Sequence, residues 1–285
     1  MKLSQIFDNK VDQNEIKSKY LWNINQNGSK KIMLRVSLSK FKIDSSWKSS
    51  SCPIGTLNCI ALPNNRSFGM IIEEENGIQY LFIADKYFNL KIIETPIKVT
   101  FDPRCFISCY YDNSIFIFEN YFNLHQELGK ANLAKRYFIS QNKWILLTKF
   151  PEIYPTTCIG LNEKIILSDD TTGIWVYDII LDSYSYHIPI KTNNNSAEQI
   201  FIKASEKLYM IIRSGINEIY CCEDPLSEWH FVSSFNDKIF RRSLIPRVYY
   251  KDSIYFLTGL TLYEFSLKNF ESKKVKKLIK EAFLT

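Results

Sequence analysis

Short apolar runs alternate with polar turns along most of the chain. The runs are rich in Ile, Tyr and Phe, and they span about four to eight residues, which is typical of β-strands. The turns between them use Asn, Asp, Ser and Lys, since the chain has only nine Gly and nine Pro. No long helical pattern separates the runs, which argues against parallel βαβ units. The pattern predicts an all-β chain of consecutive antiparallel strands.

A weak repeat groups these strands. The segment Tyr-Tyr-Asp-Asn-Ser-Ile-Phe at 110–116 returns as Tyr-Tyr-Lys-Asp-Ser-Ile-Tyr at 249–255. Ser114 and Ser253 are 139 residues apart, close to three periods of about 46 residues. Strand–turn–strand segments at 161–167 and 205–210 lie between them. Self-similarity at this spacing predicts the blades of a β-propeller.

The repeat predicts a single domain over residues 1–285, a six-bladed β-propeller of four-stranded antiparallel blades. The blades are expected at about residues 1–56, 57–98, 99–151, 152–192, 193–236 and 237–280. In the first blade, three strands are expected between residues 20 and 46, and the fourth from residues 3–8 or from elsewhere. Residues 123–135 are predicted to be an extended loop with a helical turn.

Aromatic pairs within the segments resemble the kelch repeat, in which a Tyr, often followed by Asp, precedes a Trp by seven residues. Tyr177, followed by Asp178, precedes Tyr184 by seven, and Tyr137 precedes Trp144 by seven, whereas Tyr220 precedes Trp229 by nine. The double glycine of that family is missing in every segment. The chain is thus similar to a diverged kelch-type propeller, and the resemblance implies a scaffold or substrate-recognition role.

The distribution of charge and cysteine limits the classes of partner and site. Of the formal charge of +6, half comes from the lysine-rich stretch at 271–281, in which five Lys stand against Glu271 and Glu281. This stretch either protects an edge strand or contacts an acidic partner or an anionic membrane. The remaining positive charge is too dispersed for nucleic acid. Seven irregularly spaced Cys, no leader-like start and no long apolar run predict a cytoplasmic protein with reduced thiols, no membrane span, no metal site and no cofactor.

Catalytic residues are sparse. His125, His187 and His230 are the three histidines, and none has a partner at ligand spacing. Residues 168–175, Ser-Asp-Asp-Thr-Thr-Gly-Ile-Trp, resemble the Asp-box turn of sialidase-like propellers, with the glycine one position late. A sialidase would also need several arginines to hold the substrate carboxylate.

Arginines and aromatics in the loops give the most specific binding hypothesis. They are expected to gather on the loop face of the propeller and to suit an acidic peptide or protein. The candidate residues are Arg104, Tyr121, Tyr154, Arg213, Phe240, Arg241 and Arg242. The sequence therefore favours a non-enzymatic protein-interaction module. Its alternatives are a glycan-acting, sialidase-like hydrolase and a structural subunit of a larger assembly.

Overall fold

The structure, a computed structural model, describes most of the predicted strands and the tight turns between them. The described residues are 20–27, 30–40, 42–49, 59–64, 66–72, 79–85, 87, 89–93, 106–121, 131–151, 153, 157–168, 173–188, 198–204, 207–213, 216–224, 226–235, 247–258 and 261–278.

Secondary structure in the described part of the chain consists of β-strands and turns. The strands are β1 (Tyr20–Asn27), β2 (Lys30–Ser37), β3 (Lys42–Ser49), β4 (Cys59–Leu62), β5 (Arg66–Ile72), β6 (Gln79–Ala84), β7 (Leu90–Ile93), β8 (Phe106–Tyr111), β9 (Ser114–Tyr121), β10 (Ala131–Phe138), β11 (Lys143–Leu146), β12 (Thr157–Leu161), β13 (Lys164–Ser168), β14 (Ile174–Asp178), β15 (Ser183–His187), β16 (Glu198–Ala204), β17 (Lys207–Arg213), β18 (Asn217–Cys222), β19 (His230–Phe235), β20 (Arg247–Tyr250), β21 (Ser253–Thr258), β22 (Thr261–Ser266) and β23 (Ser272–Lys277). Within these ranges, no helix has the length and apolar character that a membrane span requires.

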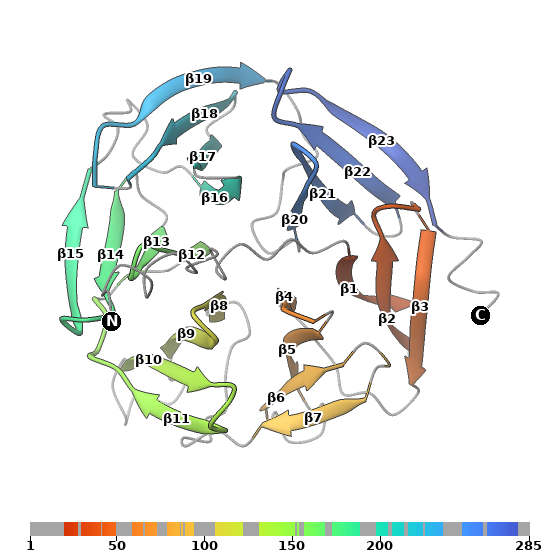
Figure 1. Cartoon of the computed structure of the whole chain (residues 1–285), viewed down its shortest axis with the longest axis horizontal. Helices are drawn as coiled ribbons and strands as arrows, with labels where there is room; N and C mark the ends of the chain where they lie inside the picture. The colour runs from red at the N-terminus through yellow and green to blue at the C-terminus, as the bar shows by residue number, and fades with distance from the viewer. Residues whose placement is uncertain are drawn as a thin grey trace, which may run out of the picture.

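Antiparallel sheets arranged around a central axis make the chain a β-propeller (Figure 1). Five blades have four strands each, in simple sequence order: β4–β7, β8–β11, β12–β15, β16–β19 and β20–β23. β1, β2 and β3 form a further sheet of three strands. The prediction of six four-stranded blades is therefore wrong, because only five sheets have four strands among the described residues. Residues 3–8, a predicted source of the missing strand, lie outside them.

The three-stranded sheet lies between the last and the first of the five blades. β1 contacts β4 on one side and β20 and β21 on the other. β3 lies on the outer wall of the ring, in line with β23 and β7 (Figure 1). The Ser-Leu pair at residues 37–38, where β2 ends, also matches the pair at 266–267, where β22 ends. The β2–β3 turn therefore resembles the turn between the third and fourth strands of the β20–β23 blade.

The hydrophobic core is divided into clusters that each join two neighbouring sheets. Phe116 of β9 packs on Tyr177 of β14, with ring centroids 6.5 Å apart. Val36 of β2 lies in one cluster with Leu257 of β21, so the three-stranded sheet shares a core with the β20–β23 blade. Bulky apolar side chains on both faces of the sheets explain why the strands show only partial alternation.

Tight turns join the first two strands of three blades, and each has two residues with positive φ. The pairs are Asp112 and Asn113, Asn162 and Glu163, and Lys251 and Asp252. Positive φ at both central residues is the geometry of the type I′ hairpin turn, which Asn and Asp tolerate better than most residues. This explains how so few glycines suffice.

The same three blades tie this first turn to the turn between their third and fourth strands. The backbone N–H of Ile179 donates to the carbonyl of Glu163 at 3.0 Å, and Ile139 and Leu267 repeat the bond at 3.2 and 3.0 Å. Both sets of turns therefore lie on one side of the ring, which we call the turn side. The ends of the second strands lie on the opposite side, the loop face.

Strand register tests the aromatic pairs of the kelch resemblance. Tyr137 lies directly opposite Trp144, and Tyr177 opposite Tyr184, with ring centroids 4.9 Å apart in both pairs. The pairing of Tyr220 with Trp229 is wrong. A β-bulge next to Tyr220 brings Phe231 opposite it.

The predicted loop at residues 123–135 is also wrong in part. β10 begins at Ala131, so the last five residues of that segment pair with β9 instead. Residues 123–130 lie outside the described ranges.

Candidate functional site

The arginine-rich surface predicted from the sequence lies mostly outside the described residues. Arg104, Tyr154, Phe240, Arg241 and Arg242 fall there. The remaining two are described by their backbone. Tyr121 ends β9 and Arg213 ends β17, so both lie at the loop face. That these seven residues form one surface stays a prediction.

The predicted Asp-box-like segment is described at its two ends. Ser168 is the last residue of β13, and Trp175 lies in β14, so the segment joins a second strand to a third. Trp175 packs on Tyr186 in a tilted arrangement, with ring centroids 5.0 Å apart, and its buried Nε1 has no hydrogen-bond partner. Residues 169–172 lie outside the described ranges.

Histidine and cysteine chemistry is limited in the part that the structure describes. Ser185 Oγ lies 3.0 Å from His187 Nε2 on the exposed strand β15. Four thiols are free there: Cys109, Cys158, Cys221 and Cys222. No three His, Cys, Asp or Glu side chains in the described ranges are placed to bind a metal ion.

A feature that the sequence analysis missed recurs on the turn side. In three blades, an Asp at or just beyond the end of the third strand accepts a hydrogen bond from the backbone N–H two residues later. The pairs are Asp85 and Tyr87 at 2.7 Å, Asp178 and Ile180 at 2.9 Å, and Asp224 and Leu226 at 3.0 Å. Each bond closes an Asx-turn and leaves a large apolar side chain in solvent. The exposed fractions are 70% for Tyr87, 71% for Ile180 and 41% for Leu226.

The turn of the β12–β15 blade exposes two such side chains in succession. Leu181, next to Ile180, is 72% exposed. The backbone N–H of Leu181 also donates to Asp178 Oδ1, at 2.9 Å. Asp178 therefore fixes the backbone of both tip residues while their side chains point away from the core.

Asp182 holds the other end of this turn against the neighbouring blade. Its Oδ1 accepts the Tyr177 hydroxyl at 2.7 Å and the Thr148 amide at 3.1 Å, and its Oδ2 accepts the Thr148 hydroxyl at 2.9 Å. Partial burial alone would raise the pKa of Asp182, but these hydrogen bonds outweigh it and lower that pKa below its ordinary value. The carboxylate is therefore charged at neutral pH.

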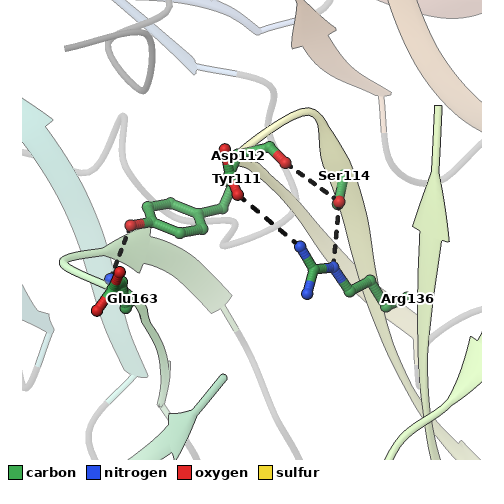
Figure 2. Close-up of polar contacts among 5 residues, drawn as sticks. All are labelled: Tyr111, Asp112, Ser114, Arg136 and Glu163. Atoms are coloured by element: carbon green, nitrogen blue, oxygen red, sulfur yellow. Dashed lines mark hydrogen bonds and ion pairs between the residues drawn. The ribbon is translucent and has the colours of Figure 1, made fainter. Parts of the chain in front are cut away.

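A second support lies at the seam between the β8–β11 and β12–β15 blades (Figure 2). The backbone N–H of Glu163 donates to the Tyr111 hydroxyl at 2.7 Å, which links the first turns of the two blades. Beside Tyr111, Arg136 Nε donates to Ser114 Oγ at 3.1 Å, and Ser114 Oγ donates to the Asp112 carbonyl at 3.2 Å.

Stacking fixes Arg136 as well. Its guanidinium lies 4.3 Å from the ring centroid of Phe138 and 5.0 Å from that of Phe116. Burial lowers the pKa of Arg136, while the Asp112 carboxylate, 4.0 Å away, acts in the opposite direction. These contacts hold the first turns of the two blades together. The tip at 180–181 is connected to them because the N–H of Ile179 donates to the carbonyl of Glu163.

Comparison with known proteins supports the propeller fold and assigns no role to the site. No protein-family model matches the chain, and no curated protein matches it. The chain is similar to the solved structure of YjhT, with a TM-score of 0.57 and 10% identity over 80% of this chain and 86% of YjhT. It is also similar to the tricorn protease, with a TM-score of 0.57 and 13% identity over 92% of this chain. The match covers only 26% of the tricorn protease, about a quarter of its length. At such low identity these likenesses establish the β-propeller fold alone.

Proposed function

We propose that this β-propeller is a non-enzymatic protein-interaction module, a kelch-like scaffold or substrate-recognition propeller that binds a protein or peptide in the cytoplasm. The observation that carries the proposal is the tip at Ile180 and Leu181. Two large aliphatic side chains in succession are 71% and 72% exposed on a turn that Asp178 and Asp182 hold in place.

The energetics of burial favour this tip as a binding anchor. Single exposed aliphatic residues are common on protein surfaces. Two on one fixed turn make a stronger binding anchor. Burying each side chain against a partner would contribute about 1.5–3 kcal/mol to binding, and the fixed backbone would lose little conformational entropy. The turn at Leu226 in the next blade adds a third aliphatic side chain on the same side of the ring.

The proposed surface differs from the one expected from the sequence. The arginine-rich candidates are expected on the loop face, whereas Ile180, Leu181 and Leu226 lie on the turn side. Binding of an acidic peptide by the loop face stays a prediction, since most of its residues lie outside the described ranges.

Fewer observations support the two alternative functions, a glycan-acting hydrolase and a structural subunit. For a glycan-acting hydrolase, the described residues supply only the ends of the Asp-box-like segment, Ser168 and Trp175. For a structural subunit of a larger assembly, the exposed tip would be an interface in that assembly. Elution of the native protein at a monomer's volume in size-exclusion chromatography would count against the structural subunit.

The proposal is tested with I180S/L181S and a matched control in the same blade. Ile188, just beyond β15, is 62% exposed and makes I188S the control for loss of exposed aliphatic surface. The tagged full-length variants are cross-linked in native extract and the captured proteins are quantified by mass spectrometry. We expect one or more partners to be captured by wild type and I188S and to be lost from I180S/L181S.

Melting temperatures of the three proteins show whether the ring is intact. The tip side chains point into solvent, so all three should melt together. If I180S/L181S captures the same partners as wild type and melts at the same temperature, the tip is not the recognition surface.

A further inference from the structure

The surroundings of the exposed tips are acidic. We call Ile180, Leu181, Leu226 and the carboxylates near them the two-turn patch. The carboxylates are Glu163, Asp178, Asp182, Glu223, Asp224 and Glu228, of which all but Asp178 are exposed. Glu163 belongs to the patch because its carbonyl accepts the N–H of Ile179, next to the tip.

Few described cations offset this charge. Lys164 lies opposite Asp178 in the sheet register, and Lys207 begins β17 beside the second turn. Lys149 follows Thr148, which bonds Asp182. Six carboxylates with three lysines leave the patch with a net charge of −3 at neutral pH. The whole chain, in contrast, carries +6, and four of its lysines lie on the distant strand β23. The patch is thus an acidic region with apolar tips on a basic protein.

We propose that the two-turn patch binds a cationic protein segment, one that places a large apolar side chain against Ile180 and Leu181 and lysines or arginines against the surrounding carboxylates. This inference rests on the proposed function and specifies the chemistry of the partner. An apolar centre with a charged rim is the usual arrangement of a protein interface. Complementary charge accelerates association and excludes acidic competitors.

Fixed tips favour a short, ordered contact. Asp178 and Asp224 accept hydrogen bonds from backbone N–H groups of their turns, which lowers the conformational entropy that the tip residues would lose on binding. Both turns lie at the outer wall of the ring, on the left in Figure 1. A segment that contacts them would run along the outside of the β12–β15 blade, beside β15.

The test selects ligands from a phage-displayed library of random short peptides against the immobilised full-length chain. We expect the selected peptides to be net positive and to contain a large apolar residue. Their affinity should fall roughly tenfold or more in I180S/L181S, the loss expected of an anchor residue. It should also fall in E163K/E223K/E228K, which reverses three exposed charges.

Two controls separate local charge from overall charge. K274E changes an exposed lysine of β23, far from the patch, and should leave affinity unchanged. Binding to wild type should weaken between ionic strengths of about 0.01 and 0.15 M, where the screening length shortens from about 30 to 8 Å.

The outcomes separate this inference from the proposed function. Neutral or acidic peptides that still depend on Ile180 and Leu181 would overturn the inference and leave the proposed function standing. Peptides that bind I180S/L181S as well as wild type, or no selection at all, would overturn both.

Discussion

Tyr177 donates its hydroxyl hydrogen to Asp182 five residues later, and Tyr137 repeats the bond to Asn142 in the preceding blade. The O···O distances are 2.7 and 2.6 Å. Each acceptor also binds the outer strand region of the blade before it, Asp182 through Thr148 and Asn142 through the Lys91 ammonium at 3.0 Å. One side chain thus closes a turn and ties two blades together.

The first prediction concerns this tyrosine bond. Y177F removes the hydroxyl and leaves the ring against Tyr184, so it should destabilise the protein by about 1 kcal/mol. Chemical denaturation measures the change in the free energy of unfolding. Y186F is the control, because Tyr186 is 45% exposed and its loss of a hydroxyl should have almost no effect. Equal losses in both variants would contradict the assignment.

The second prediction is an acid dependence of stability that comes from Asp182. Its pKa is lowered in the folded state, so the ionised carboxylate stabilises the fold above the ordinary aspartate pKa of about 4. That contribution is lost as pH falls through the folded pKa. D182N keeps an acceptor oxygen, as Asn142 does, and has no charge to titrate.

The measurement for Asp182 is denaturant unfolding of wild type and D182N from about pH 6 to about pH 3. Wild type should lose more stability than D182N in the acid part of this range. Parallel curves would show that the Asp182 charge does not contribute.

The third prediction concerns a close approach of two blades near the axis. An added Cβ at Gly160 would lie 2.5 Å from the Cβ of Tyr111, which is buried. G160A should therefore cost about 1–3 kcal/mol of stability, as overpacked cores do.

Gly173 provides the matched control for Gly160. A Cβ there would meet the ring end of Tyr186, an exposed side chain that can move aside. Thermal melting should show a clear loss in G160A and a small one in G173A. The reverse order would contradict the packing described here.

The fourth prediction concerns a buried ion pair. Lys135 Nζ lies 2.7 Å from Glu119 Oε2, and the two side chains are 1% and 4% exposed. K135M leaves the carboxylate buried without this cation and should cost about 3–5 kcal/mol. K135M/E119L removes both charges and should recover much of the loss. A double variant less stable than K135M would contradict this account.

The fifth prediction concerns thiol reactivity. Burial, with smaller effects of Cys221 and Asp224, raises the pKa of Cys222 to about 12, so almost no thiolate forms at pH 8. In native protein, Cys222 should resist iodoacetamide, whereas the partly exposed Cys221 beside it should react. Mass spectrometry of the digested protein distinguishes the two, and rapid labelling of Cys222 would contradict its burial.

Local spacing predicted much of the fold because propeller blades pair strands that are adjacent in sequence. A seven-residue spacing places Tyr137 opposite Trp144 when a tight turn joins their strands, and the same holds for Tyr177 and Tyr184. Tyr220 differs, because a longer turn and a bulge shift the register to Phe231. Trp229 packs on Phe201 in the core instead, with ring centroids 6.4 Å apart.

The proposed site was less accessible from sequence than the fold. Ile180 and Leu181 follow an apolar strand, so their composition suggests burial. The informative pattern is an Asp two residues before an apolar residue at a strand end, as at Asp85, Asp178 and Asp224. The sequence also located only three strands between residues 20 and 46, and among the described residues β1, β2 and β3 form a sheet of three.

The division of the core among neighbouring sheets determines how the molecule can come apart. Each described cluster takes side chains from two sheets, so no blade retains a complete core when it is alone. Losing one blade would expose apolar faces on both flanks. The ring should therefore melt as a single cooperative unit, and limited proteolysis inside one blade should release no stable fragment.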